Sequence, residues 1–395
     1  MGMTITEKIL AAHAGKNSVL PGDNIWVDVD VLMTHDVCGP GTFAIFKKQF
    51  GENAKVWDRD KVVIIPDHFI FTKDTHANRN IDILRQFVKE QDLPHYYDVG
   101  TDNYKGVCHL ALAQEGFNRP GEVLFGTDSH TSTSGAFGMF STGIGNTDAA
   151  FILGTGKLWV KVPESMCFEF TGTFPDHIMA KDVILNVIGD IGVDGATYRA
   201  MEWRGDAVMK LSMEERMTIC NMSIEAGARA GMISPDATTI SYLMNKIPQE
   251  DIEDVKSLTD SWLDLASDKE CQFDSVIEID ARSLEPCVTW GTNPEMSIPI
   301  TESIPDPEKA TSQEAKQAMK RALSYMDLQP GVPIQNISID RVFIGSCTNS
   351  RLSDLQAAAA ILKGNKVNEN VKAMVVPGSG LVKEQAEQEG LDKIF

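Results

Sequence analysis

The amino-acid sequence predicts an α/β protein whose sheets are largely parallel. Apolar runs of strand length occur at 61–65, 122–126 and 158–163, and they flank segments of helical periodicity such as 80–91. This alternation is typical of units in which helices cover a parallel sheet. The chain has 395 residues, of which 43% are hydrophobic, so it can build two or three domains with cores of their own.

Local patterns predict the later elements. We expect one or two helices to open in the Gly-rich segment 135–157, an edge strand at 167–175 and a helix at 176–195. The clearest helix is expected over 211–233, because Ser212 and Glu215 form a capping box at its start and Gly231 can end it.

The segment 291–335 is rich in Pro and charge, and we interpret it as an inter-domain linker that carries a short helix. A third α/β unit follows, with strands near 341–344 and 373–376. The predicted organisation is therefore domain 1 at 1–165, domain 2 at 166–290, the linker at 291–335 and the start of domain 3 at 336–395.

Composition excludes several classes of function. The formal net charge of −20 repels phosphate backbones, which argues against a nucleic-acid partner. No apolar run approaches a membrane span, and the first residues lack the apolar core of a signal peptide, so we expect a cytoplasmic protein. The seven cysteines are expected to be reduced rather than paired in disulfides. An anionic substrate would need local cations or a metal.

Polar residues that suit catalysis follow three predicted strands. Ligand sites in open α/β sheets lie beyond the carboxyl ends of the strands, so these residues could converge there. Each cluster alone is more simply explained as a solvated turn that caps a helix, but three together favour a functional site. The residues concerned are Asp67, His68, Asp128, Ser129, His130 and Cys347.

Other candidates are open to two interpretations. His109 lies in an apolar helical context, where a lone His is more often a core residue, but nearby carboxylates favour proton transfer. His35 and Asp36 follow another strand-like run, and the same alternatives apply to them. Asn221 and Glu225 share a helix face, which can be either a buried site or the exposed edge of an amphipathic helix.

Cys347 lies in Gly-Ser-Cys-Thr-Asn-Ser, between an apolar strand that we expect to be buried and the start of a helix. A helix N-terminus favours an anion, and therefore a thiolate. Thiolates serve as nucleophiles and as ligands of soft metals. A metal cluster needs several thiolates, and no other cysteine has a matching context.

At these positions the sequence resembles the aconitase superfamily, and within it the large subunits of isopropylmalate dehydratases (isomerases). The resemblance covers essentially the whole chain and implies a three-domain, aconitase-like α/β/α architecture. The segments that carry it, in order, are MTHDVCGP, IPDHF, GVCHLALAQEG, LFGTDSHTSTSGAFG, TGIGNTDAA, GATYRAMEWRG, MTICNMSIEAGA, WGTNP and IGSCTNSR.

The resemblance implies one [4Fe–4S] cluster bound by three cysteines, of which Cys347 would be one. The other two would come from a Cys-x-x-Cys pair beyond residue 395, so the chain is expected to be a truncated large subunit with an incomplete third domain. Such a chain would be inactive alone.

The resemblance also implies roles for single residues in the dehydration and rehydration of a small hydroxy dicarboxylate. His68 with Asp67 would protonate the leaving hydroxyl, and the pairs His109–Asp128 and His130–Glu225 would assist. The other residues expected around the substrate and cluster are His35, Ser129, Asn221 and Asn349. The base that removes the carbon-bound proton would lie in the swivel domain, a separate small subunit.

The resemblance therefore implies the isomerisation of 2-isopropylmalate to 3-isopropylmalate in leucine biosynthesis. Homoaconitase or a methylmalate- or dimethylmalate-type dehydratase is the alternative within the superfamily. RNA binding by a cluster-free form is an alternative from another class, and the charge of −20 argues against it.

Overall fold

The computed structural model describes residues 2–247 and 254–395. Its first unit is built on a five-stranded sheet in the order β4-β3-β2-β5-β6. Every neighbouring pair is parallel, which confirms the parallel sheet predicted from the sequence. The strands are β2 (Val31–Thr34), β3 (Val62–Ile64), β4 (His95–Tyr96), β5 (Val123–Gly126) and β6 (Phe140–Gly143).

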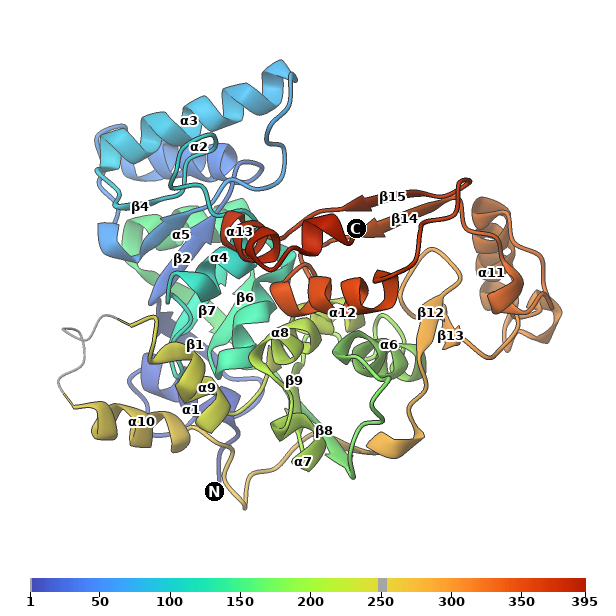
Figure 1. The fold of residues 1–395 in the computed structure, drawn as a ribbon. Helices are drawn as coiled ribbons and strands as arrows, with labels where there is room; N and C mark the ends of the chain where they lie inside the picture. The colour runs from blue at the N-terminus through green and yellow to red at the C-terminus, as the bar shows by residue number, and fades with distance from the viewer. Residues whose placement is uncertain (1, 248–253) are drawn as a thin grey trace.

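Helices cover both faces of this sheet (Figure 1). Alternate strand residues point to opposite faces, so Leu32 and Phe125 pack in one apolar cluster with α1, α2, α3 and α5, whereas Met33 and Leu124 pack against α4. The helices are α1 (Ile5–His13), α2 (Gly39–Phe50), α3 (Thr75–Gln91), α4 (Cys108–Gln114) and α5 (Asn146–Thr155). An antiparallel ribbon of β1 (Asn24–Asp28) and β7 (Lys157–Lys161) lies beside α1 and α5.

The second unit contains a four-stranded parallel sheet in the order β10-β9-β8-β11. β8 was expected to be an edge strand, and this prediction is wrong, because β8 lies between β9 and β11 and its Phe168 and Phe170 are fully buried. The strands are β8 (Ser165–Thr171), β9 (Ala200–Arg204), β10 (Ala230–Met232) and β11 (Ser275–Asp280). The helices are α6 (Ala180–Ile191), α7 (Asp206–Met209), α8 (Met213–Met222), α9 (Ala237–Leu243) and α10 (Val255–Leu263).

The helix predicted over 211–233 is shorter than expected. Its capping box of Ser212 and Glu215 is confirmed, but α8 ends at Met222, and the 3-10 helix η3 (Ser223–Ala226) follows. Gly227, with φ of 80°, ends this helical run. Gly231 does not cap the helix but lies in β10, where an added Cβ would meet Ser223 Oγ at 2.3 Å.

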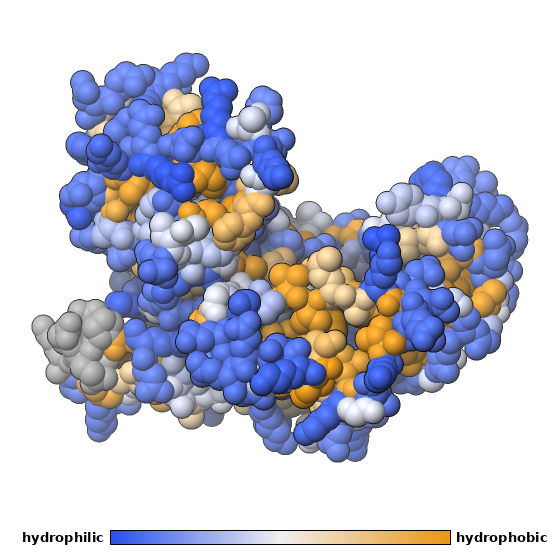
Figure 2. Space-filling model, turned by 45° about the horizontal axis from the view of Figure 1, so that its top comes forward, coloured by the Kyte–Doolittle hydropathy of each residue, from blue (hydrophilic) through white to orange (hydrophobic). Residues whose placement is uncertain are grey.

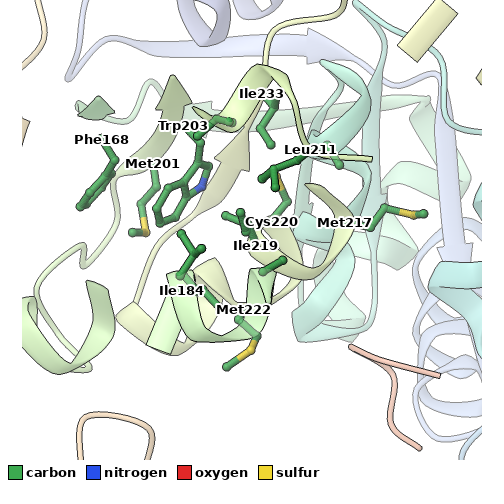
Figure 3. Close-up of a cluster of buried hydrophobic side chains, with 14 of the residues drawn as sticks. Phe168, Ile184, Met201, Trp203, Leu211, Met217, Ile219, Cys220, Met222 and Ile233 are labelled. Carbon is green, nitrogen blue, oxygen red and sulfur yellow. The ribbon is translucent and has the colours of Figure 1, made fainter. Parts of the chain in front are cut away.

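The helix α8 is embedded in the apolar core of the second unit. Met217, Ile219 and Cys220 are fully buried and lie in one cluster with Trp203 and Ile184 (Figure 3). A helix whose side chains are mostly buried holds its polar residues in fixed positions. α8 therefore provides a rigid support for the polar residues on it.

The segment predicted as a linker has structure of its own. It contains the hairpin strand β13 (Ser297–Pro299), paired with β12 (Cys287–Thr289), and the helix α11 (Gln313–Met326). Trp290, Ile304 and Leu323 form a separate apolar cluster there. The domain boundaries at 165, 290 and 335 stay predictions.

The C-terminal unit pairs β14 (Arg341–Ile344) in parallel with β15 (Lys372–Val375), next to α12 (Leu352–Leu362) and α13 (Gly380–Gln388). β14 was expected to be buried, but Phe343 and Met374 on this two-stranded sheet are largely exposed. Figure 2 shows apolar residues gathered across the middle of one face of the molecule. No helix in the described part of the chain is long and apolar enough to span a membrane.

Short 3-10 helices complete the described secondary structure. η2 (Ser129–Phe137) follows β5 and was not predicted from the sequence. The remaining ones are η1 (Arg59–Lys61), η5 (Ala281–Ser283), η6 (Pro307–Lys309), η7 (Ile334–Asn336) and η8 (Leu391–Lys393).

Candidate active site

The polar clusters follow three neighbouring strands of the first sheet and lie together at the carboxyl ends of these strands. β2 pairs with both β3 and β5, and all three run parallel, so their carboxyl ends meet. The segment after β2 carries His35 and Asp36, the segment after β3 carries Asp67 and His68, and Asp128 follows β5. The sheet order therefore brings together groups that are far apart in the sequence.

Asp128 is the centre of this arrangement. Its Oδ1 accepts hydrogen bonds from His109 Nε2 at 2.9 Å and from the backbone N–H of His130 at 2.7 Å. Its Oδ2 lies 3.2 Å from His68 Nε2. Burial alone would raise the pKa of Asp128, but hydrogen bonds with His109, His130 and His68 hold this pKa far below its usual range. Asp128 is thus a carboxylate that three histidines share.

His68 is held between two carboxylates. Its Nδ1 donates to Asp67 Oδ1 at 2.7 Å, and its Nε2 faces Asp128. The bonds to Asp128 and then to Asp67 raise the pKa of His68 to about 10. The side chain is 37% exposed, so this imidazolium can reach a bound molecule. Asp67 is fixed in turn, because its Oδ2 accepts the backbone N–H of Cys108 at 2.7 Å, at the start of α4.

Asp36 organises the backbone of the His68 segment. Its carboxylate accepts the backbone N–H groups of Asp67, His68 and Phe69 at 2.8–3.0 Å. Burial opposes its ionisation, but these backbone donors hold the pKa of Asp36 below its ordinary value. Asp36 therefore determines the position of His68, a role that the sequence did not indicate although Asp36 was a candidate beside His35.

His35 stacks on His68, with ring centroids 4.1 Å apart and planes at 14°. Its Nδ1 accepts the backbone N–H of Val37, and its Nε2 lies 3.3 Å from the carbonyl oxygen of Thr127. Burial, and then the charge of His68, lowers the pKa of His35. His35 is thus a neutral imidazole that covers the charged ring of His68.

His130 links the first unit to the second. Its Nε2 lies 3.1 Å from Glu225 Oε1, and its Nδ1 lies 3.2 Å from Ser129 Oγ. The Asp128 carboxylate, 3.6 Å from Nδ1, and Glu225 raise the pKa of His130 to about 10. The hydrogen bond from His130 in turn lowers the pKa of Glu225, against the effect of burial. Glu225 belongs to η3 rather than to α8.

Asn221 joins three parts of the chain. Its Nδ2 donates to Thr133 Oγ1 in η2 at 2.8 Å, and its Oδ1 accepts from Thr348 Oγ1 at 2.8 Å. Asn221 is fully buried, as the first alternative for the pair predicted, whereas the side chain of Glu225 is 36% exposed and lies beyond α8. The Thr133–Asn221–Thr348 chain places the Cys347 segment beside the histidines.

Cys347 lies in an exposed loop between β14 and α12. The helix begins only at Leu352, with Arg351 as its N-cap, so Cys347 is too far from the helix N-terminus to gain from its dipole. The charged side chains His130, Lys181 and Arg351 interact electrostatically with Cys347. Next to it, Asn349 Nδ2 donates to Thr218 Oγ1 and Asp354 Oδ1, whereas its buried Oδ1 has no partner among the described residues.

The chain matches the model of the aconitase family (aconitate hydratase) over residues 7–395. The chain belongs to the aconitase family. This aconitase-family chain is 47% identical to the chloroplastic 3-isopropylmalate dehydratase large subunit of Arabidopsis thaliana, over 96% of the chain and 70% of that protein. It is 41% identical to the probable 3-isopropylmalate dehydratase large subunit of Methanothermobacter thermautotrophicus, and 40% identical to the large subunit of Heliobacterium modesticaldum. Each of these two matches covers 100% of the chain and 83% of the relative.

Members of the aconitase family generally bind a [4Fe–4S] cluster, and Cys347 suits one of its thiolate ligands. Its sulfur is exposed in a cationic setting, and the unpartnered Asn349 Oδ1 lies two residues away. Cys108 also interacts electrostatically with Cys347, but burial raises the pKa of the Cys108 thiol well above its ordinary range. Among the described cysteines, Cys347 is therefore the candidate whose exposure suits a cluster ligand.

The sequence pointed to the three acid–base pairs, and the structure brings the members of each pair within 3.1 Å of each other. It gave no sign that Asp128 would serve all three histidines. It also did not indicate the supporting roles of Asp36, Thr133 and Thr348. The only signal for Asp36 was its place directly after a strand, beside His35.

Proposed function

We propose that the chain is the large, catalytic subunit of a [4Fe–4S] hydro-lyase. The enzyme isomerises 2-isopropylmalate to 3-isopropylmalate by dehydration and rehydration, in leucine biosynthesis. The observation that carries this proposal is the Asp128 carboxylate, which holds His68, His109 and His130 together beside the Cys347 loop. Removing and returning water on one small acid requires groups that give and take protons at a single place.

The imidazolium groups also bear on how so acidic a chain can bind an anionic substrate. With pKa values raised to about 10, His68 and His130 are both charged near pH 7. Both are partly exposed, so they place two cations at a site that must bind a hydroxy dicarboxylate. Neighbouring carboxylates balance the charge of these rings, so the proposed contribution of the rings is hydrogen bonds donated to the carboxylates of the substrate.

His68 is the proposed proton donor to the leaving hydroxyl. Its bond to Asp128, at 3.2 Å, is longer than its bond to Asp67, at 2.7 Å. The Nε2–H can therefore turn to a substrate oxygen while Asp67 keeps the ring in place. His109 and His130 are proposed to hold the protons and hydrogen bonds around the same carboxylate, with Glu225 orienting His130.

Cys347 is the proposed ligand for one corner of the cluster, and its remaining thiolate ligands come from outside the described residues. A bound cluster supplies Lewis-acid chemistry toward the hydroxyl and carboxylate of a substrate. Asn349, Ser129 and His35 are proposed to face the cluster and substrate. Asn221 acts through Thr348, whose hydroxyl it fixes.

A small subunit is the proposed partner, and it supplies the base that removes the carbon-bound proton. The carboxylates at the described site are already committed to other donors. Asp36 binds three backbone N–H groups, Asp67 binds His68 and Cys108, Asp128 binds the histidines, and Glu225 binds His130. The family resemblance implies a base on a separate subunit, and these existing hydrogen bonds support that part of the proposal. A cytoplasmic location stays a prediction.

Cluster assembly tests the proposal in the full-length protein. Wild type, Cys347→Ser and the control Cys38→Ser would be reconstituted anaerobically with iron and sulfide, and both elements counted per chain. Cys38 is a suitable control because it lies near the same histidines yet is only partly exposed. We expect the cluster in wild type and in the control and its loss in Cys347→Ser. Equal iron in all three proteins would contradict the ligand assignment.

A further inference from the structure

The outward face of the β1–β7 ribbon is not used by the site described above. The two strands pair antiparallel, and their residues alternate between buried and exposed positions. The inward residues of the ribbon pack in the apolar core, so the residues between them point outward. The inward residues are Ile25, Val27, Leu158 and Val160. The outward residues are Asn24, Trp26, Asp28, Lys157, Trp159 and Lys161.

Two tryptophans dominate this face. Trp26 and Trp159 stand directly opposite each other in the ribbon and are 52% and 58% exposed. Phe151 of α5 extends the surface, with its ring 5.7 Å from that of Trp26 and 37% exposed. We call Trp26, Trp159 and Phe151 the aromatic patch. Clustered, exposed Trp residues rimmed by polar groups are typical of protein interaction sites.

The charges around the aromatic patch differ from those of the chain as a whole. Lys157 and Lys161 lie on one strand, and Asp28 lies on the other. The six outward residues therefore carry two cations and one anion, whereas the formal net charge of the chain is −20. Two copies of so acidic a chain repel each other, except where a local face lacks the excess of negative charge.

We propose that the outward face of the β1–β7 ribbon is the contact between two copies of this chain. The copies are related by a twofold axis that runs parallel to the strands, between β1 and β7. Such an axis lays β1 of each copy over β7 of the other. Trp26 then packs on Trp159 of the second copy, and this contact occurs twice. Asp28 and Lys157 form an ion pair at 2.7 Å within each copy, and each also faces the opposite charge of the second copy.

The residue register favours a second copy over another occupant. A twofold contact requires a face that is complementary to itself. Opposite positions of the ribbon provide this, because Trp26 is paired with Trp159 and Asp28 with Lys157. An axis perpendicular to the strands would instead set Lys157 against Lys161, which like charges disfavour. Face-to-face packing of two such ribbons also matches the aligned arrangement of stacked sheets.

Sedimentation equilibrium over a concentration series tests this contact. Wild type is expected to approach twice the monomer mass, whereas Trp159→Glu stays monomeric. Tyr325→Glu is the matched control, since Tyr325 is 80% exposed on α11, away from the ribbon, and its replacement should leave the dimer intact. Circular dichroism of each variant shows that it is folded.

Charge reversal distinguishes contact between copies from a contact within one chain. Asp28→Lys and Lys157→Asp alone each put like charges at the contact, so each should be monomeric. An equimolar mixture of the two variants restores both opposite-charge pairs across the contact, and it is expected to dimerise. If wild type stays monomeric, the proposal is overturned, and the aromatic patch would bind another partner, such as an acidic protein. A dimer that survives Trp159→Glu, or a mixture that stays monomeric, would also overturn it.

Discussion

Replacing Asp128 by Asn keeps the shape of the side chain and removes the charge that three histidines share. The pKa of His130 is about 10 in place of 6.5, and Asp128 is the larger of its two carboxylate contributions. We expect Asp128→Asn to lower this pKa by about 1 to 2, which corresponds to about 1.4–2.8 kcal/mol of interaction with the charged ring. This range agrees with the about 1.5–3 kcal/mol of a hydrogen bond to a charged group.

The stability that Asp128→Asn loses should be larger at low pH than at high pH. A histidine whose pKa is raised by folding stabilises the folded state fully below its unfolded pKa of about 6.5. This stabilisation disappears as pH rises through about 10, the pKa of His130 in the folded chain. The difference in unfolding free energy between wild type and Asp128→Asn should therefore be larger at pH 6 than at pH 10.

NMR titration of the histidines and urea unfolding at the two pH values measure these effects. Asp102→Asn is the control, because Asp102 lies exposed on a loop. We also expect kcat/KM to fall by about 10²–10⁴-fold, the usual contribution of a positioned acid or base. An unchanged His130 pKa, or a stability loss equal at both pH values, would refute the idea that Asp128 holds these histidines charged.

Three further changes, one of them with a matched control, test the residues that support the site. Asp36→Asn removes the charge that accepts three backbone N–H groups, so kcat should fall at least tenfold with KM little changed, as steady-state kinetics would show. Gly135→Ala should destabilise the protein by about 2–3 kcal/mol in urea unfolding, because its Cβ would meet Gly231 O at 1.7 Å. Gly145→Ala meets nothing within 4 Å and should cost less than about 1 kcal/mol, since it loses only the preference for Gly at the N-cap of α5. Arg351→Met loses the bond to Thr348 O, so amide exchange over 346–350 should accelerate; unchanged exchange would contradict this anchoring role.

Local patterns in the sequence predicted the elements that depend on neighbouring residues. The strands β3 and β5, the helix α3 and the capping box of α8 follow from short runs of residues, and all are present. The order of strands does not follow from such runs. β8 carries the same pattern whether it has one neighbour or two, and only the folded sheet puts β11 on its second edge.

The same limit applies to the site. A sequence shows that Asp67 and Asp128 each follow a strand, but it does not show that these strands flank β2. That arrangement lets one carboxylate reach His68 and His109 together. The end of a helix is equally hard to predict, because Gly231 serves strand packing while Gly227 ends the helical run.

Turnover of a panel of hydroxy acids tests the central claim most directly. The protein, with matched iron content and the proposed small-subunit partner, would be offered 2-isopropylmalate, homocitrate and the methylmalates, and the unsaturated product would be followed by its ultraviolet absorbance. We predict the highest kcat/KM with 2-isopropylmalate, and its collapse in Asp128→Asn. A preference for homocitrate or a methylmalate, or turnover that survives the loss of Asp128, would contradict the account.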